Sequence, residues 1–159
     1  MKRFLVLSDI HVPVYQRDIP KVIYEISKEF DGIIALGDFT NLDTVLTLES
    51  LNVNFHGVSG NMDDFEVKMH LLERKVLRLE GLVVGLIHGW GPPYDIIERI
   101  YKKFLDTEVD LVIFGHTHQP ISTVYSGVSF LNPGSATPGG SYGILTIDGR
   151  DFEFQVQRL

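Results

Sequence analysis

Five short clusters of polar residues carry the side chains of this chain that could do chemistry. They supply carboxylates, an amide oxygen and imidazoles, which are ligands for hard and borderline divalent metal ions. The clusters are Asp9-Ile10-His11, Gly37-Asp38, Gly60-Asn61-Met62-Asp63, His88-Gly89 and Gly115-His116-Thr117-His118. No single cluster offers enough ligands to hold a cation well, but together they offer enough for two. We therefore predict a binuclear metal site of the kind that catalyses hydrolysis.

Each cluster taken alone has a simpler explanation. Asp9 and His11 could form a turn, and Asp38 could cap the next helix. Gly60-Asn61 is a common turn pair, because both residues tolerate positive φ, and His88 could be a hydrogen-bonded buried histidine. A metal site is favoured because the clusters occur together and most of them follow an apolar run that is typical of a buried strand.

The Gly-His-Thr-His cluster has a sharper pattern than the others. In an extended segment alternate side chains lie on the same side, so His116 and His118 can face one common site. By itself this pattern leaves a structural role equally open.

The first half of the chain has a pattern typical of alternating strands and helices. Buried strands are predicted at residues 4–7, 32–36 and 53–58, and helices at 19–30 and 42–51. This order predicts a parallel sheet with right-handed crossovers. Ligands of open α/β sheets bind beyond the carboxyl ends of the strands. We therefore expect convergence at one edge for the residues that follow apolar strand candidates, which are Asp9, Asp38, Asn61, His88 and His116.

The second half has shorter and more closely spaced apolar runs. Strands are predicted at 76–79, 82–87, 111–114, 121–125, 128–131, 142–147 and 152–156, a helix at 94–105 and a loop at 132–141. Such spacing predicts a largely antiparallel second sheet. We expect one α/β domain, residues 1–159, in which two sheets pack face to face with helices outside.

Composition restricts the partners and the compartment. The net charge of −7 argues against a stable nucleic-acid complex, although bound cations would still allow a phosphate ester to bind. No segment reaches the roughly 18 apolar residues of a membrane span, and we expect the first apolar run to be a strand rather than a signal peptide. The absence of cysteine fits a reducing compartment, so we predict a cytoplasmic protein; homo-oligomerisation stays open.

Taken in order, the clusters resemble the motifs of the calcineurin-like metallophosphoesterase superfamily. These motifs are Asp-x-His, Gly-Asp, Gly-Asn-x-Asp, a Gly-His-Gly-like element and Gly-His-x-His. The resemblance extends from Asp9 to the strand after Asn132-Pro133-Gly134-Ser135, and the short chain is similar to the small bacterial and archaeal phosphodiesterase branch. It implies a four-layer α/β sandwich with two mixed β-sheets, in agreement with the pattern of elements.

The resemblance also implies a role for each cluster. It assigns Asp9, His11, Asp38 and His118 to a first metal ion, and Asp38, Asn61, His88 and His116 to a second. Asp38, Asn61 and His88 would also be catalytic, in a reaction where a hydroxide shared by both metal ions attacks phosphorus. The expected cofactors are two divalent ions, with Mn²⁺ first and Ni²⁺, Fe²⁺, Co²⁺ or Zn²⁺ as alternatives.

The predicted substrate is a small phosphodiester, nucleotide-like in character. The alternatives are a phosphomonoesterase or pyrophosphatase with the same metals, and a non-catalytic scaffold such as the phosphoesterase-like subunit of retromer. Asn61, His56, Trp90 and Tyr94 are candidate substrate contacts. For His56 a packed strand histidine is the alternative, and for Trp90 and Tyr94 a rigid loop before a helix.

Two positions depart from the family pattern. Met62 stands where many members carry a histidine that assists the leaving group, and a thioether cannot act as a general acid. Ser59 stands where related small members often carry an arginine. We therefore expect esters with poor leaving groups to be hydrolysed slowly, whereas the metal ligands are unaffected.

Overall fold

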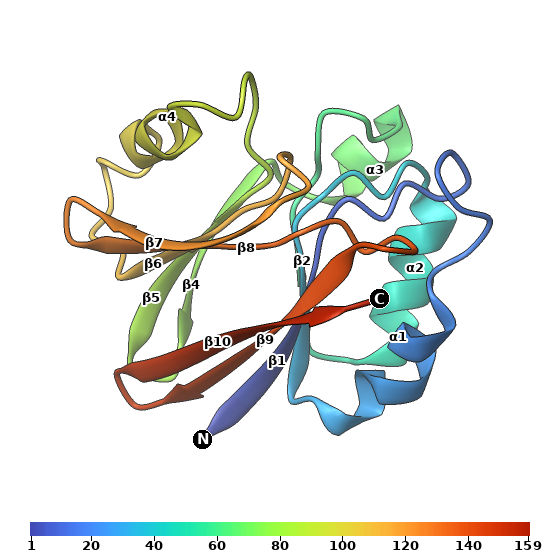
Figure 1. Cartoon of the computed structure of the whole chain (residues 1–159), viewed down its shortest axis with the longest axis horizontal. Helices are drawn as coiled ribbons and strands as arrows, with labels where there is room; N and C mark the ends of the chain where they lie inside the picture. Colours follow the sequence, from blue (N-terminus) through green and yellow to red (C-terminus); the bar gives the residue numbers. More distant parts are fainter.

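The computed structural model describes residues 1–159 and has four layers (Figure 1). The first sheet has the order β10-β9-β1-β2-β3 and comprises β1 (Lys2–Leu7), β2 (Gly32–Ala35), β3 (Phe55–Gly57), β9 (Ser141–Asp148) and β10 (Asp151–Arg158). The second sheet has the order β4-β5-β6-β8-β7 and comprises β4 (Arg74–Leu79), β5 (Leu82–Ile87), β6 (Leu111–Ile113), β7 (Pro120–Tyr125) and β8 (Val128–Pro133). Both sheets are mixed.

Helices form the two outer layers. They are α1 (Lys21–Ile26), which continues as a 3-10 turn (Ser27–Glu29), α2 (Leu42–Leu51), α3 (Phe65–His70) and α4 (Ile96–Lys102). α1 and α2 cover the first sheet and α4 covers the second (Figure 1). The predicted α/β sandwich with helices outside is confirmed. None of the helices is both long enough and apolar enough to cross a membrane.

The central strands are buried on both faces. In β1, Phe4 and Val6 belong to the core between the sheets, whereas Leu5 and Leu7 belong to the core beneath the first helical layer. The two sets alternate because successive side chains of a strand point to opposite faces. This double coverage explains why β1 is a continuous apolar run rather than an alternating one.

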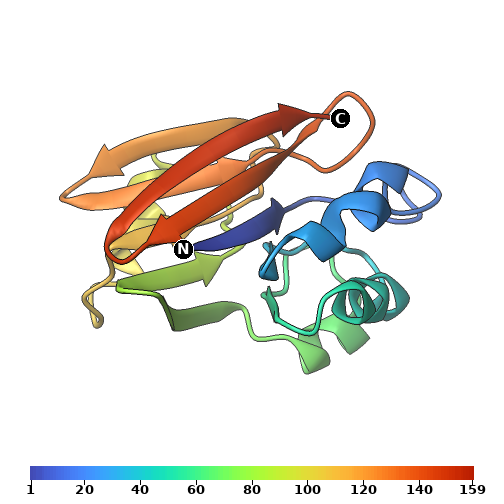
Figure 2. The same ribbon diagram turned by 90° about the horizontal axis from the view of Figure 1, so that it is seen from below.

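The last hairpin does not join the second sheet. β9 pairs antiparallel with β1, and Figure 2 shows the β9–β10 hairpin lying beside β1. Within the second sheet, β5 pairs parallel with β6, and β6 pairs parallel with β8. The prediction of a largely antiparallel second sheet was therefore wrong. Strand spacing along the chain does not report pairing, and α4 supplies the crossover that a parallel pair needs.

Several element boundaries also differ from the predictions. The helix predicted at 19–30 ends at Ile26 and tightens into a 3-10 turn, and the strand predicted at 53–58 is only Phe55–Gly57. The side chain of Asn52 explains the late start of that strand, because its amide donates to the Phe30 carbonyl and its oxygen accepts from the Asn54 N–H. Such local side-chain bonds replace the strand ladder. Helix α3 was not predicted.

Candidate metal centre

The carboxyl ends of the parallel strands bring the clusters to one edge of the molecule. Strands β1, β2 and β3 are in parallel register, with Leu7 opposite Ala35 and Ala35 opposite Gly57. The backbone then continues this contact, since the Asp9 N–H donates to the Gly37 carbonyl at 3.1 Å. The second sheet meets the same edge through β5 and β6, which carry the His88 and Gly115 clusters.

The chain turns sharply at most of the predicted ligands. A left-handed backbone is found at Asp9 (φ 54°), His11 (φ 50°), Asp38 (φ 57°), His116 (φ 70°) and His118 (φ 62°). For a residue with a Cβ this conformation costs roughly 1–2 kcal/mol. Strained non-glycine residues concentrate at functional sites, where the surrounding structure holds them in place.

Four predicted ligands form a buried group that we call the floor. Asp9, His11, Asp38 and His88 are each at most 3% exposed. His11 Nε2 lies 3.8 Å from Asp9 Oδ1 and 3.6 Å from Asp38 Oδ2. His88 Nε2 lies 3.6 Å and 3.0 Å from the same two oxygens. Donors that share one cation at about 2.1 Å lie roughly 3.0–3.5 Å apart, so this spacing is near that of a coordination shell.

Three atoms of the floor are buried without a hydrogen-bond partner: Asp9 Oδ1, His11 Nε2 and His88 Nε2. Each such atom costs about 1–3 kcal/mol, and packing gives no reason to place three of them together. His88 Nδ1 lies 2.6 Å from the Leu36 carbonyl, which can only accept, so Nδ1 carries the proton and Nε2 of the neutral ring keeps its lone pair. A ligand histidine is held in this way in metal proteins. The floor therefore fits divalent cations.

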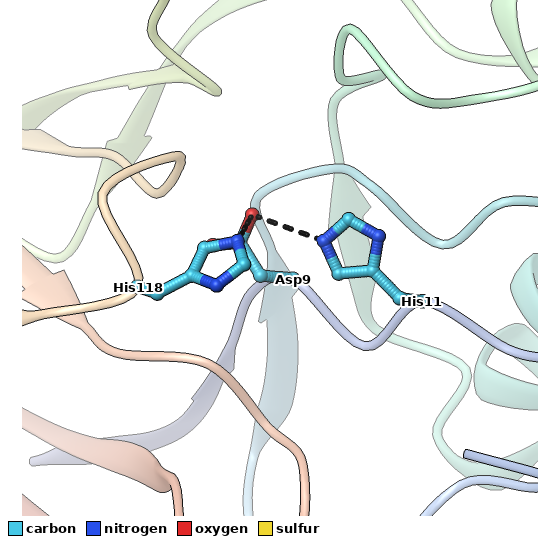
Figure 3. A group of neighbouring side chains, drawn as sticks. All are labelled: Asp9, His11 and His118. Atoms are coloured by element: carbon cyan, nitrogen blue, oxygen red, sulfur yellow. Dashed lines mark ion pairs between the residues drawn. The ribbon is translucent and has the colours of Figure 1, made fainter. Parts of the chain in front are cut away.

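A third imidazole completes one ligand group. Asp9, His11 and His118 offer ligand atoms within 4.8 Å of one another, as do Asp9, Asp38 and His88. Figure 3 shows Asp9 between the rings of His11 and His118, with His118 Nε2 3.4 Å from Asp9 Oδ1. The two groups share Asp9 rather than Asp38, although Asp38 Oδ2 also lies near His11.

The remaining predicted ligands lie at the solvent side, and we call Asn61, His116 and His118 the rim. His116 Nε2 lies 2.8 Å from the Gly91 carbonyl and so carries a proton. Nδ1 of the neutral ring then presents a lone pair to Asn61 Oδ1, 3.3 Å away. Two lone pairs that face each other at this distance suit two ligands of one cation.

The buried carboxylates and the imidazoles of the site shift one another's pKa values. Burial by itself would raise the pKa of Asp9, but contacts with His11 and His118 outweigh it and hold that pKa well below its usual range. Burial would likewise lower the pKa of His88, but Asp38 and Asp9 outweigh it and raise the pKa. The contact with Asp9 raises the pKa of His118. Both rings therefore hold their second proton to a higher pH than a free imidazole does, and a metal ion that takes the same lone pair must displace that proton.

Asp63 supports the floor without being one of its ligands. Its Oδ2 accepts from the backbone N–H groups of Asp38 at 3.0 Å and Gly60 at 2.7 Å, and its Oδ1 accepts from the Thr40 N–H at 2.8 Å. Burial raises the pKa of Asp63. Asp38 is held a second time, because its Oδ1 accepts from the Met62 N–H at 2.8 Å. Asp63, the last residue of the Gly-Asn-Met-Asp cluster, therefore positions Asp38, the proposed ligand of the Gly-Asp cluster.

The Asn132-Pro133-Gly134-Ser135 segment connects the two sheets beneath the site. Asn132 Nδ2 donates to the Gly115 carbonyl at 2.9 Å, and Ser135 Oγ donates to the Asp9 carbonyl at 2.8 Å. Gly115 itself has no room for a side chain, because a Cβ there would collide with the Ser8 hydroxyl, which donates to Asp9 Oδ2. The sequence did not identify these supporting roles; the Asn-Pro-Gly-Ser motif was their only signal.

The family model described as the calcineurin-like phosphoesterase superfamily domain matches residues 1–150. The chain belongs to this superfamily. The predicted resemblance is thus confirmed, and membership supports metal-dependent hydrolysis of phosphoric esters. It also implies divalent metal ions, for which the floor and the rim supply candidate ligands.

Relatives match nearly the whole chain. A probable metallophosphoesterase of Methanothermobacter thermautotrophicus is 31% identical over 157 residues, which is 96% of this chain and 90% of that protein. A Thermotoga maritima protein of known solution structure is 48% identical, with a TM-score of 0.84 and full coverage of both chains. Vps29 from Entamoeba histolytica, solved with Zn²⁺, is 27% identical, with a TM-score of 0.77 and coverage of 99% and 98%.

In this phosphoesterase a cavity of about 530 Å³ opens beside the site, and Asn61, His88 and Trp90 are among the residues that line it. Two of the predicted substrate contacts are not among its lining residues. His56 lies in β3 with its ring 6.5 Å from that of Phe4, and Tyr94 is 71% exposed in the segment between β5 and α4. Of the predicted substrate contacts, Asn61 and Trp90 therefore line the cavity beside the metal site, and His56 and Tyr94 do not.

Proposed function

We propose that this chain is a phosphodiesterase that uses two divalent metal ions. The observation that carries the proposal is the convergence of three unpaired buried atoms, on Asp9, His11 and His88, beside Asp38 Oδ2. Asp9, His11, Asp38 and His118 would hold one ion, and Asp38, Asn61, His88 and His116 the other. Mn²⁺ is the proposed metal, because mixed imidazole and carboxylate ligands suit it.

When bound, the two cations supply an acidified water and neutralise the charge of the phosphate. The protein's own contribution is to hold the ligands in place before the substrate arrives. The backbone clamp of Asp63 on Asp38 and the bond from His88 Nδ1 to the Leu36 carbonyl do this for the floor. Such preorganisation avoids reorganisation during the reaction. In the lining of the cavity, the amide Nδ2 of Asn61 can donate to a phosphate oxygen.

The space around the site supports a diester rather than a monoester. A diester carries two organic groups on phosphorus, and both need room. The cavity that holds Trp90 accommodates one of them, and the open rim at His118, whose side chain is 38% exposed, leaves the other in solvent. A cavity of about 530 Å³ lies within the usual size of a small-molecule site. Trp90 offers an aromatic face to a nucleoside or aryl group.

The experiment that tests this proposal combines metal removal with a substrate panel. Chelation should abolish hydrolysis of bis(p-nitrophenyl) phosphate, and added Mn²⁺ should restore it. The restored enzyme should prefer this diester to p-nitrophenyl phosphate and to pyrophosphate in kcat/KM. Full activity of a metal-free sample would overturn the metal role, and a preference for the monoester or pyrophosphate would overturn the diester assignment.

The likeness to Vps29 supports a second candidate, a non-catalytic interaction scaffold on the same fold. Metal content alone does not separate the two candidates, because that Vps29 was itself solved with Zn²⁺. Hydrolysis separates them. A chain that retains two bound metal ions and has no activity on any of the esters would be a scaffold.

A further inference from the structure

The cavity beside the metal centre is lined by three basic residues as well as by the proposed ligands Asn61 and His88. Its lining includes Lys68 from α3, Arg74 at the start of β4 and Lys103 just after α4, with Glu73 as the one carboxylate. Figure 1 shows α3 beside the first sheet and α4 over the second, so the two lysines come from opposite halves of the molecule. This concentration of positive charge stands against a net charge of −7 for the whole chain.

The three cations are not equally available to a ligand. Arg74 is engaged with Asp106 at 3.1 Å, and its guanidinium lies over the ring of Phe104. Lys68 and Lys103 form no ion pair, although the protein contains more acidic than basic residues. The fold therefore places two ammonium groups that have no ion pair in the lining of a cavity that the proposed ligands Asn61 and His88 also line.

Trp90 adds an aromatic surface to the same cavity. The ammonium of Lys103 lies 5.5 Å from the centre of the Trp90 ring, a distance at which a cation and an aromatic face attract each other. A ring and a cation side by side suit a ligand that has both a planar group and negative charge. Nucleotides have this combination.

We propose that Lys68 and Lys103 form a second anion subsite in this cavity, and that the natural substrate carries a phosphate group besides the ester phosphate at the metal ions. This inference rests on the proposed function, because Asn61 and His88 line the cavity and are also proposed ligands. The ester phosphate would lie beside Asn61 and His88. The second phosphate would lie beside Lys68 and Lys103. The organic group that joins the two phosphates would lie against Trp90.

The subsite can be tested without catalysis. Trp90 is the only tryptophan of the chain, so its fluorescence reports directly on the cavity. Inorganic pyrophosphate is titrated into chelator-treated protein, and Lys68→Gln or Lys103→Gln should each weaken its affinity about tenfold, which is typical for the loss of one charge-assisted contact. Glu73→Gln should act in the opposite direction and strengthen binding, since it removes a negative charge from the lining.

Lys102→Gln is the matched control. Lys102 is next to Lys103 in sequence, but it pairs with Glu98 at 3.8 Å and does not line the cavity. The affinity of the Lys102→Gln variant for pyrophosphate should equal that of the wild type. Equal affinities for wild type, Lys68→Gln and Lys103→Gln would overturn the subsite.

A second experiment uses the metal-loaded enzyme and two dinucleotides that differ in one group. These are adenylyl-adenosine with and without a 5′-terminal phosphate. The wild type should have a roughly tenfold higher kcat/KM for the phosphorylated compound, and this ratio should fall towards one in the Lys68→Gln/Lys103→Gln double variant but persist in Lys102→Gln. A ratio near one in the wild type would overturn the inference. If neither ester is hydrolysed, the proposed function fails, and the fluorescence titration alone decides the subsite.

Discussion

The floor and the rim of the candidate metal centre differ in burial and in support. The floor residues are at most 3% exposed, and their backbone or rings are fixed by Asp63, Ser135 and the Leu36 carbonyl. The rim residues are less buried, and the side chain of His118 is 38% exposed. One half of the site is thus part of the core, and the other half belongs to the surface.

This difference indicates that the fold uses different residues to retain the metal ions and to admit the substrate. Buried, oriented ligands bind a cation with little loss of freedom, because their conformations are already fixed. Exposed ligands leave open positions for water and phosphate, as a catalytic metal site requires. We therefore expect substitutions in the floor to remove the metal ions, and substitutions in the rim to change activity more than metal content.

The largest effect should come from Asp38→Ala. It removes the carboxylate proposed to be shared by both ions, and kcat/KM for bis(p-nitrophenyl) phosphate should fall roughly 10³-fold or more. Metal analysis should show loss of both ions. Asp64→Ala is the matched control, because Asp64 is exposed and its side chain makes no capping bond. Unchanged activity and metal content in Asp38→Ala would show that Asp38 is not a metal ligand and only holds the Met62 N–H; a helix cap is not the alternative, because Asn41 caps α2.

His118→Ala should have a smaller effect. It removes one rim ligand and leaves the floor intact, so we expect a loss of about 10- to 100-fold in kcat/KM with at least one ion retained. Metal content and rate are measured on the same preparation. A variant that loses both ions, as Asp38→Ala should, would show that the rim is as important for retention as the floor.

The pH dependence of metal affinity should separate the two regions further. The pKa values of His88 and His118 are raised, so both rings take up protons as the pH falls, and a metal ion must displace these protons. Affinity should therefore decrease as the pH falls through the raised pKa values, by up to about tenfold per pH unit for each proton displaced. Isothermal titration calorimetry with Mn²⁺ between pH 6 and 8 measures how the affinity changes with pH. His118→Ala should reduce this change, and an affinity that is independent of pH would contradict the protonation of both rings.

The smallest effect concerns Met62, which lies next to the rim. Its backbone N–H holds Asp38, but its side chain is 55% exposed and cannot donate a proton to the leaving group. Wild-type rates should depend steeply on leaving-group pKa across substituted phenyl diesters, and Met62→His should flatten this dependence, with a gain of up to about tenfold on poor leaving groups. Metal content should not change. A flat dependence in the wild type would reveal another acid.

Much of the fold followed from local patterns in the sequence. The apolar run that ends before Asp9, and the similar runs before Asp38 and His88, predicted central strands because only doubly covered strands are continuously apolar. The candidate ligands followed from the same pattern, since polar residues at strand exits meet at one edge. The order of the motifs predicted the superfamily. Element boundaries were less predictable, because side chains such as that of Asn52 end elements through bonds to distant backbone.

Only the tertiary structure decided which strands are neighbours and which groups support the site. β9 returns to pair with β1 across more than a hundred residues, and no local pattern encodes that pairing. The three backbone bonds of Asp63 and the cavity between Lys68 and Lys103 likewise join segments that are far apart in the sequence. Residue types and their periodicity therefore determine what each segment can contribute. The contacts between segments, which depend on packing of the whole chain, determine where each contribution acts.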